Sequence, residues 1–149
     1  MRDKRKEINM KNKSAFITDL LLFLASAFFC TGTKFVFHAC GKKEDGSYMS
    51  CHWAEQAVFA VSISIVIISL LVLLVKNRKF KAGAAAALIP CALMAAIIPN
   101  NMINLCMMNT MRCHSTMRPF VITASAVIII IAAADIFLNI NSKENKNEA

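Results

Sequence analysis

The chain has 149 residues, of which 57% are hydrophobic, and its formal net charge at pH 7 is +8. This apolar content exceeds that of an ordinary soluble domain and predicts an all-α integral membrane protein. A charge of +8 would favour nucleic-acid binding in a soluble protein. Here the lysines and arginines flank apolar stretches and form no basic face interleaved with aromatic residues, so we expect no nucleic-acid partner.

Four apolar stretches predict four transmembrane helices arranged as two tandem hairpins. We expect a basic tail over residues 1–14, a transmembrane domain over 15–140 and a second tail over 141–149. The predicted helices cover residues 15–37, 54–75, 82–98 and 119–140. The first of them has 23 residues, about 34 Å of helix, which is enough to cross a hydrocarbon core of about 30 Å. No cleavage site of small residues clearly follows it, so we expect this helix to stay in place.

Polar and small residues inside these stretches qualify the prediction. We expect Pro90 to break the third helix, and we expect Asp19 and Asp135 to lie at the membrane interface near the ends of their helices. In the third stretch small residues recur at every fourth position, which would let another helix approach closely. These residues are Gly83, Ala87, Cys91 and Ala95.

The basic residues predict the orientation in the membrane. Six of the 17 lie in the N-terminal tail, four follow the second helix and two lie in the C-terminal tail, so 12 are on one side and 5 on the other. By the positive-inside rule, both termini are cytoplasmic and the other two connections face outward. We therefore expect a multi-pass protein of the cell membrane, with the lipid bilayer as its first partner.

A Met-x-Cys-His pattern occurs in each outward connection at a constant offset of 62 residues. The two copies are Met49, Cys51, His52 and Met111, Cys113, His114. Each copy follows one apolar helix and precedes another. The matched pattern and topology predict a parallel repeat, in which two hairpins are related by an axis along the membrane normal.

The outward connections also hold the third histidine, His38, and two further cysteines, Cys40 and Cys106. Thiolate, thioether and imidazole groups are ligands for copper(I), zinc or haem iron, so both pattern copies and His38 are candidates for a joint metal or cofactor site. Two local disulfides, one joining Cys40 to Cys51 and the other Cys106 to Cys113, are an equal alternative.

Catalytic signatures are absent from the sequence. It contains no C-x-x-C, Walker, G-x-S-x-G or H-E-x-x-H motif. Hydrolytic or nucleotide-driven catalysis is therefore not expected, and no catalytic residue is predicted.

Two resemblances add to this interpretation. Met49-x-Cys51-His52-Trp53 opens the second predicted helix, a proline lies near the end of the third, and a further Met-x-Cys follows it. This pattern resembles the bacterial membrane family catalogued as domain of unknown function 4418, which implies four transmembrane helices and no established activity. The architecture alone is similar to that of quinone-linked membrane enzymes that make disulfides, although their C-x-x-C is missing here.

These observations leave three hypotheses. The leading one is a non-enzymatic membrane protein whose outward Cys/His/Met site binds a soft metal or haem, as an accessory or sensing subunit of a transport system. The second is a quinone-linked thiol-disulfide oxidoreductase. The third is a helical scaffold with disulfide-clamped loops that packs against a larger permease through its small-residue face.

Overall fold

The computed structural model of the protein describes residues 2–36, 46, 48, 50–103 and 113–147. Side chains are described for residues 13–36, 46, 48, 50–77, 79–99, 101–103 and 115–139. Four α-helices account for most of this part of the chain: α1 (Arg2–Thr31), α2 (Ser50–Leu74), α3 (Arg78–Ile97) and α4 (Arg118–Asn147). Three π-helical turns lie beside them: η1 (Gly32–Val36), η2 (Ile98–Met102) and η3 (Cys113–Met117). No β-strand occurs among the described residues.

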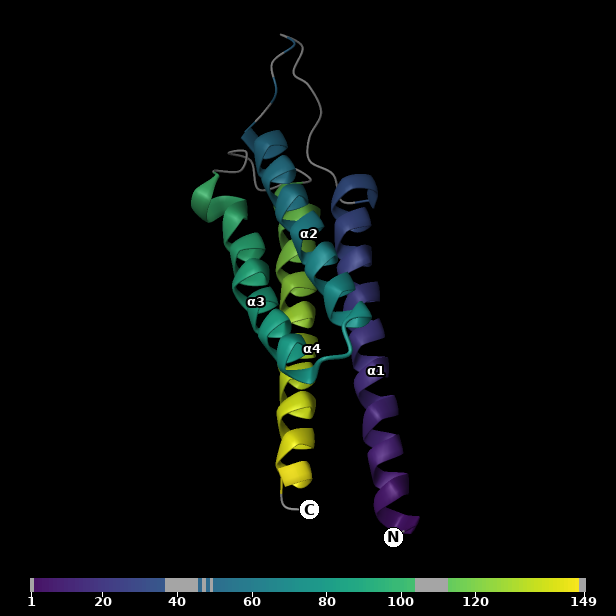
Figure 1. The fold of residues 1–149 in the computed structure, drawn as a ribbon. Coiled ribbons are helices and arrows are strands. Elements are labelled where there is room, and N and C mark those ends of the chain that lie inside the picture. The colour runs from purple at the N-terminus through teal and green to yellow at the C-terminus, as the bar shows by residue number, and fades with distance from the viewer. Residues whose placement is uncertain (1, 37–45, 47, 49, 104–112, 148–149) are drawn as a thin grey trace.

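The helices lie side by side with their long axes roughly aligned (Figure 1). Each helix packs against the next along the chain, and α4 also packs against α1, which closes the bundle. At one end, here called the terminal end, lie the start of α1 and the end of α4, and the short α2–α3 connection faces the same end (Figure 1). Helices α1 and α4 extend beyond this connection. The starts of α2 and α4 lie at the opposite end, here called the motif end, because the Met-x-Cys-His pattern occurs there.

A seam of buried residues runs through the centre of the bundle with the alternating spacing of three and four residues that is typical of left-handed helix packing. In α2 the seam includes Cys51, Val58, Ile65 and Val72, and in α3 it is Ala85, Leu88, Ala92 and Ala95. Many seam residues are Ala or Ser, which lets helix backbones approach closely. One buried hydrogen bond, 2.7 Å long, joins Ser26 Oγ of α1 to Ser69 Oγ of α2.

Large apolar side chains cover the outside of the bundle on all four helices, including Phe28, Leu74, Leu93 and Ile130. Such a surface would not be stable in water, and lipid is its natural surrounding. Four segments are long and apolar enough to cross a membrane: Lys13–Val36, Ser50–Leu74, Lys79–Ile97 and Ser115–Asn139. The chain is therefore a multi-pass membrane protein, as predicted.

The third helix differs from its prediction in two respects. Helix α3 continues through Pro90, which is exposed on the bundle surface, so the expected break was wrong. Inside a membrane, a helix tolerates a proline when neighbouring groups and small local adjustments satisfy the freed backbone carbonyl. The small residues at every fourth position also do not share one face: Gly83 and Ala87 are exposed, whereas Ala95 is buried in the seam. Residues spaced by four move progressively around a helix of 3.6 residues per turn. Residues spaced alternately by three and four, as in the seam, stay on one face.

Candidate functional site

The motif end brings together the starts of α2 and α4, to which the two copies of the sequence pattern belong. Helix α2 begins at Ser50, so Cys51, His52 and Trp53 form its first turn. The π turn η3 begins at Cys113 and leads directly into α4. The expected meeting of the two hairpin tips at one end of the bundle is therefore compatible with the described backbone (Figure 1). The side chains of Cys113 and His114 lie outside the described residues.

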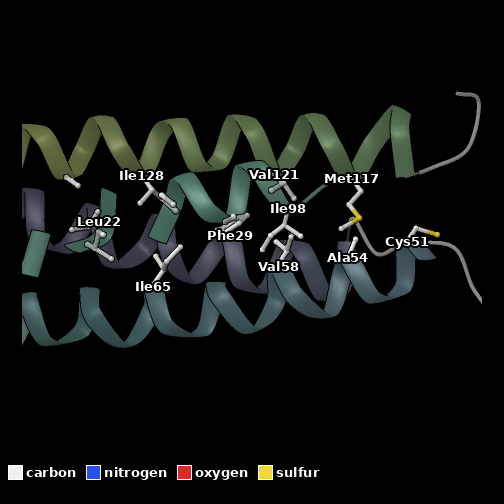
Figure 2. Close-up of a cluster of buried hydrophobic side chains, with 14 residues drawn as sticks. Leu22, Phe29, Cys51, Ala54, Val58, Ile65, Ile98, Met117, Val121 and Ile128 are labelled. Atoms are coloured by element: carbon white, nitrogen blue, oxygen red, sulfur yellow. The ribbon is translucent and has the colours of Figure 1, made fainter. Parts of the chain in front are cut away.

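Cys51 is the pattern residue that enters the core. Its side chain is fully buried at the end of the seam, in the same cluster as Ala54 and Met117. Figure 2 shows these three side chains at the motif end of the row of buried residues, with the Met117 thioether directed toward Ala54. A thiol from α2 and a thioether from the last residue of η3 are thus buried at the same end of the bundle.

His52 points away from this cluster. Successive residues of an α-helix are about 100° apart around its axis, so a buried Cys51 turns His52 to the side and Trp53 outward. The His52 ring stacks on Tyr48 with ring centroids 4.3 Å apart, and it meets the exposed Trp53 ring edge-on at 6.1 Å. Aromatic side chains with a polar atom are common where a membrane meets water, and this group fits that position.

An ion pair lies one turn further along α2. Lys34 Nζ of η1 is 3.6 Å from Glu55 Oε1 and 5.4 Å from the centre of the Phe59 ring. The Glu55 side chain is 7% exposed and that of Lys34 is 36% exposed, so the carboxylate is inside the bundle and the ammonium is at its rim. The buried Glu55 carboxylate of α2 thus has a basic partner from η1.

The remaining predicted site residues are not placed. His38, Cys40, Met49, Cys106 and Met111 lie outside the described residues, so both predicted disulfides stay predictions. Among the described side chains, no group of three or more His, Cys, Asp or Glu is arranged to hold a metal ion. Two other cysteines within spans, Cys30 and Cys91, are free thiols.

A second polar group, at the terminal end, was missed by the sequence prediction. The side chains of Asp19 and Asp135 are completely buried inside the bundle, which the sequence analysis did not predict. Lys81 Nζ of α3 forms an ion pair with Asp19 Oδ2 of α1. Asn139 Nδ2 donates to Asp135 Oδ1 at 3.0 Å and to the Asp135 carbonyl oxygen at 2.9 Å. We call these four residues the inner cluster.

One signal in the sequence could have revealed the inner cluster. Asp19 lies three residues before the buried Leu22, and Lys81 lies four residues before the buried Ala85. Asp135 likewise follows the buried Ala132 by three residues. All three charged residues therefore continue the alternating spacing of the seam, which predicts a position inside the bundle.

Comparison with known proteins identifies a family. A family described as "Domain of unknown function (DUF4418)" matches residues 22–138, from the first membrane span to the last. No curated protein and no solved structure matches the chain. The match covers the motif end and two of the four residues of the inner cluster, Lys81 and Asp135.

Proposed function

This chain belongs to the DUF4418 family, and from its own residues we propose that it is a membrane protein that binds copper(I) at its motif end. The observation that supports this proposal is the burial of the Cys51 thiol beside the start of α4, in one cluster with the Met117 thioether. Thiolate and thioether sulfur are soft ligands, and they select copper(I) over harder ions. The second pattern copy, Cys113 and His114, begins at the same end and would complete the donor set.

The surroundings suit a bare ion better than a haem. Next to Cys51 the seam consists of closely packed side chains, including Ala54, Val58, Ile98 and Val121. A macrocycle would need a wide apolar slot, whereas a copper ion needs only two or three sulfur or imidazole ligands in a protected place. When bound, copper(I) would neutralise the Cys51 thiolate, which is otherwise costly inside an apolar bundle.

The proposal includes an orientation. Both termini and the α2–α3 connection lie at the terminal end (Figure 1), and 12 of the 17 basic residues belong to these segments or to the first residues of α3. The positive-inside rule then favours a cytoplasmic terminal end and a motif end on the outer side of the cell membrane. A soft-metal site there suits an accessory or metal-sensing subunit of a larger transport system.

Burial of Cys51 gives the thiol-oxidoreductase alternative less support. A thiol that exchanges disulfides with partner proteins must be reached by them, and reactive cysteines are partly exposed. The Cys51 side chain has no exposed surface.

Anaerobic titration with copper(I) tests the proposal directly. The full-length protein, purified in detergent under reducing conditions, should bind copper(I) in competition with a chromogenic chelator, and X-ray absorption should show sulfur ligands. Cys51→Ser should lose this binding and Met117→Leu should weaken it. The matched control is Cys91→Ser, which removes a free thiol of a membrane span and should bind like wild type. Equal binding by wild type and Cys51→Ser would rule the site out.

A further inference from the structure

The inner cluster joins three helices at the terminal end of the bundle. Asp19 comes from α1, Lys81 from α3, and Asp135 and Asn139 from α4. Asp19 and Asp135 are both fully buried at this end of the bundle, where α1 packs against α4, so their charges and that of Lys81 act on one another. The two carboxyl groups and the one ammonium group therefore form a single electrostatic unit.

Among the described side chains, this unit contains two acidic groups and one basic group. Two carboxylates face one ammonium, and Asn139 is neutral. Among the described side chains of α2, the helix between α1 and α3, the buried residues at this end are Ser69 and Val72. Lys76 beyond α2 is exposed, as are Lys13 of α1 and Lys79 of α3. An uncompensated negative charge in an apolar bundle costs far more than a neutral carboxyl group does.

Each carboxyl group also has one buried oxygen without a hydrogen-bond partner among the described residues. These atoms are Asp19 Oδ1 and Asp135 Oδ2, and both side chains are fully buried. The other oxygen of each group is occupied, by Lys81 in one case and by Asn139 in the other. A buried acceptor without a partner is destabilising, so two in neighbouring groups need an explanation.

We propose that Asp19 and Asp135 hold one proton between them, and that the inner cluster is a proton-binding site with Lys81 as its fixed counter-ion. A carboxyl that carries the proton donates to the other carboxylate, so one proton satisfies both unpartnered oxygens. The same proton brings the charge of the cluster to zero. No metal ion is required, because the Lys81 ammonium already occupies the cation position beside Asp19.

The position of the cluster allows exchange with water at one end of the bundle. The Lys81 side chain is 13% exposed although Asp19 is fully buried, so this side chain extends from the cluster to the surface of the bundle. Release of the proton to water breaks the hydrogen bond between the two carboxyls and leaves one uncompensated negative charge. The two carboxylates then repel each other across the packed α1–α4 contact. Protonation thus couples to the packing of the first helix against the last.

Infrared spectroscopy of the metal-free, full-length protein in lipid nanodiscs tests this proposal. At neutral pH the wild type should show the carbonyl band of a protonated carboxylic acid, shifted to lower frequency in D₂O. Asp135→Asn should remove the band, because the amide replaces the protonated acid without a charge. Lys81→Gln should raise it to about twice its intensity, because both carboxyls must then be neutral.

Glu55→Gln is the matched control, since Glu55 is also a buried carboxylate but has Lys34 as a balancing partner. The band should not change in this variant. The absence of the band in the wild type at neutral pH would overturn the proposal without any variant. Its persistence in both Asp19→Asn and Asp135→Asn would also overturn it. Loss of the band on adding sodium at constant pH would show that a metal cation balances the cluster instead.

Discussion

The two ends of the bundle each bury a lysine–carboxylate ion pair, and the pairs differ in balance and in exposure. At the motif end Lys34 and Glu55 balance each other, and the lysine lies at the rim. At the terminal end Lys81 faces two carboxyl groups, and Asp19 is completely enclosed. An ion pair at a rim can use water to solvate either partner, whereas an enclosed one cannot. Similar ion pairs therefore contribute differently to stability when the number of charges around them and their access to water differ.

Removal of Lys81 should have the largest effect on stability. Lys81→Met leaves Asp19 and Asp135 without a counter-ion, and loss of one partner from a buried pair costs about 3–5 kcal/mol. Unfolding in mixed micelles with increasing SDS measures this cost. The double variant Lys81→Met, Asp19→Asn should recover most of it, because its remaining polar groups are neutral or can be protonated. A single variant as stable as wild type would show that the inner cluster is not enclosed.

The glycines of the two ends should differ in the opposite direction from the ion pairs, because substitution should cost more at the motif end than at the terminal end. A Cβ added at Gly32, at the motif end, would lie 2.5 Å from Phe120 Cζ, whereas a Cβ at Gly83, near the terminal end, would meet nothing within 4 Å. Gly32→Ala should therefore cost about 1–3 kcal/mol through overpacking. Gly83→Ala should be neutral or stabilise by up to about 1 kcal/mol, because alanine favours the helix. The same SDS titration compares them, and equal effects would contradict the packing of η1 against α4.

Removal of Lys34 should cost much less than removal of Lys81. Lys34→Met breaks an ion pair with a half-exposed partner at the end of the bundle, where exposed pairs contribute up to about 1 kcal/mol. High salt should reduce the difference between this variant and wild type, since water and ions reach the rim. If Lys34→Met destabilises as much as Lys81→Met, the distinction between rim and interior is wrong.

The smallest expected effect is at the serine pair between α1 and α2. Ser26→Ala removes the hydrogen bond between Ser26 Oγ and Ser69 Oγ, and such bonds within membranes contribute about 0.6 kcal/mol on average. A double-mutant cycle with Ser69→Ala isolates this coupling from the loss of each hydroxyl. A coupling energy of zero would show that this hydrogen bond does not stabilise the contact between α1 and α2, which would then depend on the packing of the seam side chains.

Much of the fold could be predicted because hydropathy is local information. The four spans and the all-helical class follow from runs of apolar residues, and the structure confirms them. The helices extend beyond the predicted spans, since α1 includes the basic residues from Arg2 and α4 continues to Asn147. The family suggested by the Met-x-Cys-His-Trp pattern is confirmed by the match over residues 22–138.

The candidate sites were predicted less completely, for geometric reasons. The Met-x-Cys-His pattern directed attention to Cys51 and His52 together, but adjacent helix positions point in different directions, and of these two only Cys51 enters the core. Asp19 and Asp135 were treated as separate interface residues because each lies near the end of its own span. Their register with the seam showed that they face inward, but it could not show that they face each other.

The sequence by itself determined that the chain has four segments long and apolar enough to cross a membrane, because this depends on the order of apolar and polar residues along one helix. Only the tertiary structure decided which buried groups meet. That depends on the packing of α1 against α4, which closes the bundle, and on how far each helix is shifted along the bundle axis relative to its neighbours. Asp19 and Asp135 are far apart in the chain, and their meeting beside Lys81 arises from packing of shapes rather than from any local preference.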